Sequence, residues 1–86
     1  MAKAKFQKGD IVKVKNVSWM TAKYRGLVTE ISGIDKGRVF ITSRRVISRI
    51  YRLKKIGYER EFKASDLNKT TEREAFLYHL HGPGKY

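Results

Sequence analysis

The chain of 86 residues contains no cysteine, no long apolar run and few acidic side chains. Without cysteine, disulfides and thiolate zinc ligands are excluded, so packing must hold the fold, and the composition is compatible with a reducing cytosol. No apolar stretch approaches the roughly 20 residues of a membrane span, and the start, Met1–Lys5, lacks the apolar centre of a signal peptide. We therefore expect a cytoplasmic protein, and we do not favour binding to a membrane surface, because no basic stretch also carries an exposed apolar stripe.

The small number of acids leaves a large positive charge. Eight Asp and Glu residues face 20 Lys and Arg residues, which gives a formal net charge of +12. The excess lies in residues 1–26 and 44–55, each +6, whereas residues 27–43 and 56–86 are neutral. With 41% hydrophobic residues the chain is too apolar to be disordered. We expect one small folded domain whose basic surface binds polyphosphate.

Residues 44–55 carry six positive charges and no negative one, with large apolar side chains between them. A run of one charge sign adds self-repulsion without helping folding, so a segment that only needed solubility would mix signs. We interpret this segment as burying one face and presenting the other to an anionic partner. Its cations that we expect to contact phosphate are Arg44, Arg45, Arg49, Arg52, Lys54 and Lys55.

The chain begins with a basic lead-in, residues 1–7, in which Phe6 is the first core candidate. The alternation in Ile11–Lys15 then predicts a strand with Val12 and Val14 facing inward. A long loop follows and ends before a second strand.

That first loop, Asn16–Arg25, combines aromatic and basic side chains. Trp19 either plugs one end of the core or stacks on an unpaired base, and the sequence leaves both interpretations open. The residues on this side of the molecule that we expect to contact nucleic acid are Lys13, Lys15, Trp19, Lys23, Tyr24 and Arg25.

A hairpin is expected after the loop. Leu27–Ile34 alternates and is rich in β-branched residues, Asp35–Gly37 has the composition of a turn, and Arg38–Thr42 would return. Ser43–Ile56 fits either a helix with an apolar stripe or a strand. We favour a strand that pairs with Tyr58–Phe62, because both segments contain residues that prefer strands.

The C-terminal part is expected to form a helix. Ala64–Leu67 predicts a tight turn that places its last residue in the core, and Thr71 followed by Glu74 has the spacing of a capping box. The helix is expected over residues 70–81, before a tail of residues 82–86. Its apolar side would consist of Ala75, Phe76, Leu77 and Leu80.

Three short stretches resemble the small SH3-like β-barrels of the KOW and Tudor type: Lys8–Val14, Arg25–Ile31 and Glu61–Leu67. In such barrels a Gly-Asp opens the first strand, a Gly precedes the second strand after a long loop, and a turn like Ala-Ser-Asp-Leu precedes the last strand. The resemblance implies a mainly β fold, an SH3-like barrel of about five antiparallel strands over residues 8–69, to which the chain adds its C-terminal helix. KOW domains occur in ribosomal proteins and NusG-type transcription factors, so the resemblance also implies a first loop that meets RNA or protein.

The residue pattern gives no support for catalysis or metal binding. His79 and His81 are two residues apart and would lie on different sides of a helix. Glu59 and Glu61 are better explained as charge partners of neighbouring Arg and Lys than as an acid and a base. There is also no Gly-rich phosphate loop. We expect no enzyme activity, no cofactor and no metal.

Two functions of different classes follow from these features. The first is a basic, non-enzymatic protein, associated with a nucleoid or a ribosome, that contacts the phosphate backbone of DNA or RNA largely without sequence specificity. The alternative is an SH3-like adaptor that docks on an acidic protein partner of the transcription or translation machinery. The sequence leaves open the kind of nucleic acid, its strandedness and the oligomeric state.

Overall fold

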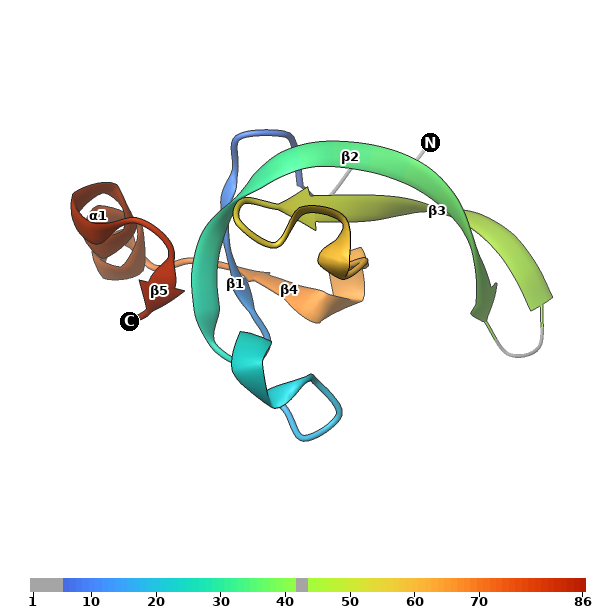
Figure 1. The fold of residues 1–86 in the computed structure, drawn as a ribbon, viewed down its shortest axis with the longest axis horizontal. Coiled ribbons are helices and arrows are strands. Elements are labelled where there is room, and N and C mark those ends of the chain that lie inside the picture. The colour runs from blue at the N-terminus through green and yellow to red at the C-terminus, as the bar shows by residue number, and fades with distance from the viewer. Residues whose placement is uncertain (1–5, 42–43) are drawn as a thin grey trace.

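The computed structural model describes the backbone of residues 6–41 and 44–86, and the side chains of these residues apart from 38–48. Residues 1–5 of the expected lead-in lie outside this range. Within the described residues the fold is mainly β, with five antiparallel strands and one C-terminal α-helix, as the sequence predicts (Figure 1). The elements are β1 (Ile11–Val14), η1 (Ala22–Tyr24), β2 (Leu27–Ile41), β3 (Arg44–Leu53), η2 (Gly57–Glu59), η3 (Ala64–Asp66), β4 (Leu67–Lys69), α1 (Glu72–His81) and β5 (Gly84–Lys85), where η marks a short 3-10 helix. In this part of the chain no helix has both the length and the apolar character needed to cross a lipid bilayer.

The 15-residue strand β2 connects the sheet, because it pairs with three other strands. Its first residues lie against β1 and β5, and the stretch from Ile31 to Ile41 pairs with β3. β4 pairs with β1 and completes the order β3-β2-β1-β4. In the described residues β3 and β4 do not pair with each other, so the sheet is open and does not close into a barrel.

The hydrophobic core forms around β1. Val12 and Val14 of this strand are fully buried, as the alternation predicts. Phe6, the expected first core residue, is buried and lies edge-on to Tyr51, with 5.8 Å between the ring centroids. The buried cluster consists of Phe6, Val12, Val14, Met20, Tyr24, Ile31, Tyr51, Leu53, Ile56, Phe62 and Leu67.

The turn expected at Asp35–Gly37 is wrong, since β2 continues through these residues and pairs with β3. The Asp35 carboxylate pairs with Arg52 across the strands, with 2.9 Å between Oδ2 and Nε. Gly37 is needed for close packing, because a Cβ there would collide with Cδ1 of the buried Ile50. Asp35 and Gly37 therefore resemble turn residues in the sequence, but in the structure each contacts a residue of the paired strand β3.

Residues 44–53 form β3, which confirms the strand interpretation over the helix. The expected pairing with Tyr58–Phe62 is wrong in extent, because a single antiparallel bridge joins Tyr51 to Phe62 and η2 lies in between. The chain leaves β3 through Lys55, whose φ of 68° lies in the left-handed region. A tight exit from the strand thus replaces a second hairpin.

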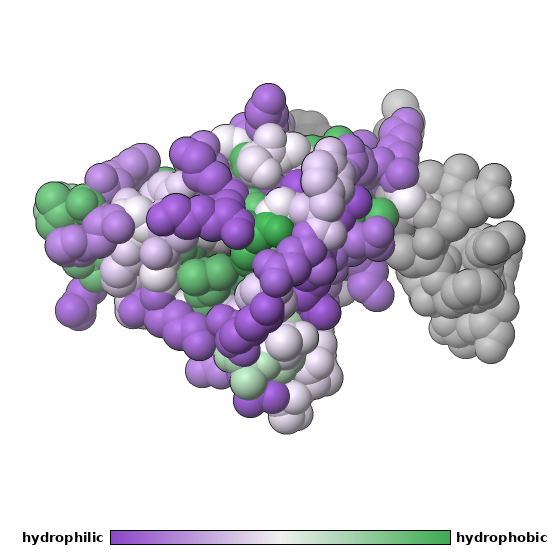
Figure 2. All heavy atoms as spheres, viewed as in Figure 1, coloured by the Kyte–Doolittle hydropathy of each residue, from purple (hydrophilic) through white to green (hydrophobic). Residues whose placement is uncertain are grey.

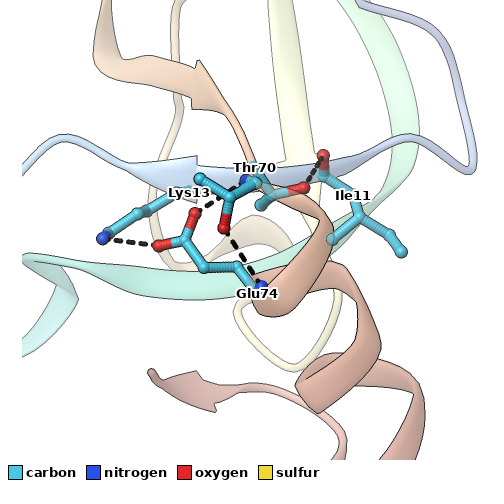
Figure 3. A network of polar contacts seen from close by, with 5 residues as sticks. Ile11, Lys13, Thr70 and Glu74 are labelled. Carbon is cyan, nitrogen blue, oxygen red and sulfur yellow. Dashed lines mark hydrogen bonds and ion pairs between the residues drawn. The ribbon is translucent and has the colours of Figure 1, made fainter.

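The predicted cap of the C-terminal helix is confirmed (Figure 3). The Thr71 hydroxyl accepts a hydrogen bond from the Glu74 N–H at 3.2 Å, and the Glu74 carboxylate accepts one from the Thr71 N–H at 2.9 Å. The other oxygen of that carboxylate lies 2.7 Å from Nζ of Lys13 on β1. Glu74 therefore fixes both the start of α1 and its position on the sheet. The turn before Leu67 is also confirmed, as η3, and Leu67 is fully buried.

The side of α1 that faces the sheet differs from the expected apolar side. Tyr78 is buried and donates a hydrogen bond to Glu30 on β2 at 2.9 Å, whereas Phe76 and Leu80 are 64% and 61% exposed. Burial and this hydrogen bond raise the pKa of Tyr78 to about 12, and the same bond lowers the pKa of Glu30. Polar contacts at Glu74 and Tyr78 thus set the rotation of the helix. The expected tail forms β5 against β2.

The contact between Glu74 and Lys13 predicts a pH-dependent stability. The Lys13 ammonium and then the Thr71 N–H hold the pKa of Glu74 below its ordinary value of 4.5. The stabilisation is therefore complete above about pH 4.5 and is lost as the pH falls through the lowered folded-state value. Glu74→Gln should lower the free energy of unfolding by about 1 kcal/mol at pH 7.

Urea unfolding of both proteins between pH 7 and pH 3 measures this effect. The difference between the two midpoints should shrink as the pH falls below 4.5. Glu72→Gln is the matched control, since Glu72 is exposed and makes no ion pair with the described residues. A difference that stays constant over the whole pH range would contradict the role of the charge.

Candidate nucleic-acid interface

The distal parts of β2 and β3 form a two-stranded arm, residues 35–41 and 44–50, that extends away from α1 and the other strands (Figure 1). The register is continuous along the arm and places Lys36 directly opposite Arg49. Since positions alternate between the two faces of a strand pair, positions 36, 38, 45 and 49 share one face. All four are Lys or Arg in the sequence. The register thus places four basic positions of the arm on one face, together with positions 40 and 47, which are Phe and Ile in the sequence.

The facing pair Lys36 and Arg49 is exposed and has no acidic partner among the described residues. Like charges directly opposite one another destabilise a strand pair. A nearby carboxylate would remove this cost, but Asp35 is already engaged with Arg52. An anion bound from outside the chain would relieve the repulsion instead.

The register divides the arginines that the sequence grouped together. Arg45 and Arg49 share one face of β3, whereas Arg44 and Arg52 belong to the other. The side chains of Arg44 and Arg45 lie outside the described residues. The sequence predicts that these four arginines form one surface, whereas the register distributes their positions over the two faces of β3.

Arg52 is held by the protein itself. Its side chain is 14% exposed and contacts Asp35 at 2.9 Å and Glu61 at 3.8 Å. Its guanidinium also lies 4.5 Å from the centroid of the Tyr58 ring. Arg52 is therefore a structural residue at the base of the arm.

Three further predicted contact residues take part in ion pairs within the fold. Lys13 pairs with Glu74, Lys23 with Glu59 at 3.2 Å, and Lys54 with Glu30 at 3.4 Å. Glu59 and Glu61 act as charge partners of Lys23 and Arg52, as the sequence indicates. The pairs of Lys23 and Lys54 are well exposed, so both lysines can exchange their partner for a phosphate at little cost.

The cations without an internal partner are spread more widely than the sequence indicates. Of the predicted residues, Lys15, Arg49 and Lys55 have side chains that make no ion pair or hydrogen bond with the described residues. The same holds for five cations that were not predicted: Lys8, Lys36, Lys63, Lys69 and Arg73. Most of these lie in segments whose local charge is balanced, so a count of charges along the chain does not single them out.

Trp19 lies at the surface and does not plug the core. It is 60% exposed, while its neighbour Met20 is 1% exposed and anchors the loop. The guanidinium of Arg25 donates hydrogen bonds to the carbonyls of Ser18 and Met20, each at 2.7 Å, on either side of Trp19. The loop is thus fixed in a shape that presents the indole to solvent. The interpretation that Trp19 plugs one end of the core is therefore wrong, and stacking on a base stays a hypothesis.

Tyr24, the other predicted aromatic contact, is a core residue. It is 7% exposed and lies edge-on to Phe62, with 5.8 Å between the ring centroids. Its ring has no open face on which a base could stack. The sequence gives no signal for this burial, because Tyr24 stands beside Lys23 and Arg25 in an irregular segment.

Tyr58 is an exposed aromatic residue that the sequence analysis assigned to a strand. It is 81% exposed, because η2 takes the place of the expected strand. The exposed ion pair between Lys23 and Glu59 joins η1, which follows the Trp19 loop, to η2, which contains Tyr58.

A metal site finds no support in the described residues. These residues contain no group of three or more His, Asp or Glu side chains arranged to hold a metal ion. His79 and His81 are exposed on α1. Comparison of the chain with protein-family models, curated proteins and solved structures gives no match. The resemblance to KOW and Tudor barrels therefore stays a prediction.

The two hydrogen bonds of Arg25 predict that this residue controls the mobility of the Trp19 loop. Arg25→Ala should lower the free energy of unfolding by about 1–3 kcal/mol, since it leaves two carbonyls without a charged donor. It should also increase the fast depolarisation of Trp19, the only Trp in the chain, in time-resolved fluorescence anisotropy. Lys23→Ala removes the same charge without touching these carbonyls and should leave the decay unchanged. An unaltered decay in Arg25→Ala would mean that Met20 alone fixes the loop.

Proposed function

We propose that the protein is a non-enzymatic nucleic-acid-binding protein that contacts the phosphate backbone largely without reading sequence. It acts in the cytoplasm, on DNA or RNA of a nucleoid or a ribosome. This proposal is supported by one observation: nearly all carboxylates are engaged within the fold, whereas several Lys and Arg side chains have no ion pair with the described residues.

Seven of the eight carboxylates accept an ion pair or a hydrogen bond from the described residues. Asp10 and Asp66, for example, accept backbone N–H groups in turns, at 2.9 and 2.8 Å. Glu72 is the exception and lies in the first turn of α1. The acids thus stabilise turns, the helix and the sheet, and they leave the free cations without a counter-charge.

The arm is the part of this surface that best fits a nucleic-acid backbone. Its sequence contains no acid other than Asp35, and Arg52 neutralises that residue. Lys36 and Arg49 face each other at the root of the arm, and the register adds positions 38 and 45 farther along the same face. Each phosphate that replaces a condensed counterion contributes favourable entropy, so a row of cations binds any sequence.

The other end of the molecule offers an internal comparison for the arm. Figure 2 shows hydrophilic side chains over much of the face in view, and apolar ones both at the end where α1 lies and near the centre of the face. Lys69 and Arg73 lie next to and within this helix, and their side chains are exposed without an ion pair to the described residues. They carry the same charge as Lys36 and Arg49 but belong to β4 and α1, which lie apart from the arm (Figure 1).

Reversing the charge of the facing pair tests the proposal. Lys36→Glu with Arg49→Glu keeps a like-charged pair in the sheet, so folding should change little. Affinity for mixed-sequence duplex DNA, single-stranded DNA and structured RNA should fall by roughly tenfold or more in each case. The slope of log K against log salt should decrease in magnitude by roughly 2, which fluorescence anisotropy at several salt concentrations measures.

Lys69→Glu with Arg73→Glu is the matched control, because it changes the net charge by the same amount. It should lower affinity much less than the arm variant. Equal losses would assign binding to the net charge and not to the arm. If the unaltered protein binds none of the three ligands but retains a partner from nuclease-treated extract, the acidic-protein adaptor replaces this proposal.

A further inference from the structure

Two aromatic side chains that the fold leaves in solvent carry a conclusion about the form of the nucleic acid. Trp19 is 60% and Tyr58 81% exposed, whereas Tyr24, Tyr51 and Phe62 are buried in the core. Phe76 on α1 is also exposed, but no arginine contact like those described below is found for it in the described residues. Exposed apolar residues are common singly. These two differ from incidental exposure because the fold holds each of them in place.

Trp19 is presented by a loop that is ordered on both sides of it. The Arg25 guanidinium fixes the carbonyls of Ser18 and Met20, and the Met20 N–H donates to the Val17 carbonyl at 3.0 Å in a tight turn. The buried Met20 side chain ties this turn to the core. A ring held in this way loses little conformational entropy when a planar ligand stacks on it.

Tyr58 is supported from the protein side by a cation. The Arg52 guanidinium lies 4.5 Å from its ring centroid and is itself fixed by Asp35 at 2.9 Å. Because the ring is 81% exposed, it remains open to a second planar group. Stacking of a base would then build a layer of base, tyrosine and guanidinium.

Contacts between neighbouring elements relate the segments that carry the two rings to each other and to the root of the arm. The ion pair between Lys23 and Glu59 joins the segment after the Trp19 loop to the residue after Tyr58. Tyr58 contacts Arg52, which lies on β3 three positions after Arg49. By the alternation of the strand, Arg52 and Tyr58 lie on the face of β3 opposite to Arg49, so a nucleic-acid strand that reaches both the rings and the charged face must pass around the root of the arm.

We propose that Trp19 and Tyr58 stack on unpaired bases, so that the preferred ligand is single-stranded nucleic acid. This inference rests on the proposed function, since the arm supplies the phosphate contacts. Bases in a duplex are stacked on each other and paired, and their faces are not accessible to a side chain. Every base has such a face in a single strand, so the two rings add affinity without adding sequence preference.

Four oligonucleotides of equal length distinguish stacking from charge: single-stranded DNA, single-stranded RNA, duplex DNA and a single-stranded abasic DNA that keeps its phosphates. The DNA and RNA strands identify which sugar the site prefers. Single strands with bases should quench the fluorescence of Trp19, whereas the duplex and the abasic strand should not. Because the chain has one Trp, the signal belongs to this side chain.

Trp19→Ala and Tyr58→Ala should each lower affinity for the base-containing single strands by roughly tenfold to a hundredfold. Affinity for the abasic strand and the duplex should change by less than about twofold. Trp19→Phe and Tyr58→Phe retain an aromatic face and should recover most of the affinity. Both residues are exposed, so the thermal midpoints should stay close to that of the unaltered protein.

Three results would overturn this inference, and they bear differently on the proposed function. If all four ligands bind with the same steep salt dependence and neither alanine variant changes any affinity, stacking is overturned and backbone binding stands. If no ligand binds, both ideas fail together. A loss of affinity in the alanine variants that is equal for the abasic and the base-containing strands would also overturn the stacking role.

Discussion

The pairing of β2 with three other strands is the interaction on which the rest of this small fold depends. β1 and β5 lie against its first residues and β3 against the remainder, so both the body and the arm use the same backbone. The helix is attached to it as well, through the bond from Tyr78 to Glu30. β2 passes from the body into the arm as one strand, with a shift of register against β3 between Ile31 and Gly33, and the ladder is regular from Gly33 to the end of the arm.

The second constraint is electrostatic. A domain with a net charge of +12 must offset self-repulsion with a short supply of acids. It uses them where each gives the most order: at the start of α1, in turns, and in ion pairs that join elements distant in sequence. As a consequence no carboxylate of the described residues pairs with Lys36 or Arg49, although these two cations lie directly opposite each other.

Much of the fold can be predicted from local patterns. The alternation at Val12 and Val14, the capping spacing of Thr71 and Glu74, and the strand character of residues 44–53 all correspond to the structure. These features depend on neighbours within a few residues. The errors share the opposite property, because Gly37 and Asp35 serve partners on another strand and therefore only look like a turn.

The candidate site could be predicted less well than the fold, for the same physical reason. Charge and aromaticity are visible in a sequence, but whether Arg25 faces a ligand or two carbonyls depends on how the loop folds. Arg52 and Lys13 appear free in the sequence and are paired in the structure. Tyr58 could be identified only after the strand expected around it proved to be η2.

The continuous register of the arm limits how its length can change over evolution. Every cross-strand pair from Gly33 and Arg52 to Ile41 and Arg44 follows one uninterrupted register. Insertion or loss of a single residue in either strand would exchange the two faces for every position beyond it, and the cations would point away from one another. Only a change of two residues in each strand, that is of two successive facing pairs, would preserve both the pairing and the face of the basic positions. The arm can therefore lengthen or shorten in steps of two residues per strand, while Gly37 between two of the basic positions stays constrained by the buried Ile50.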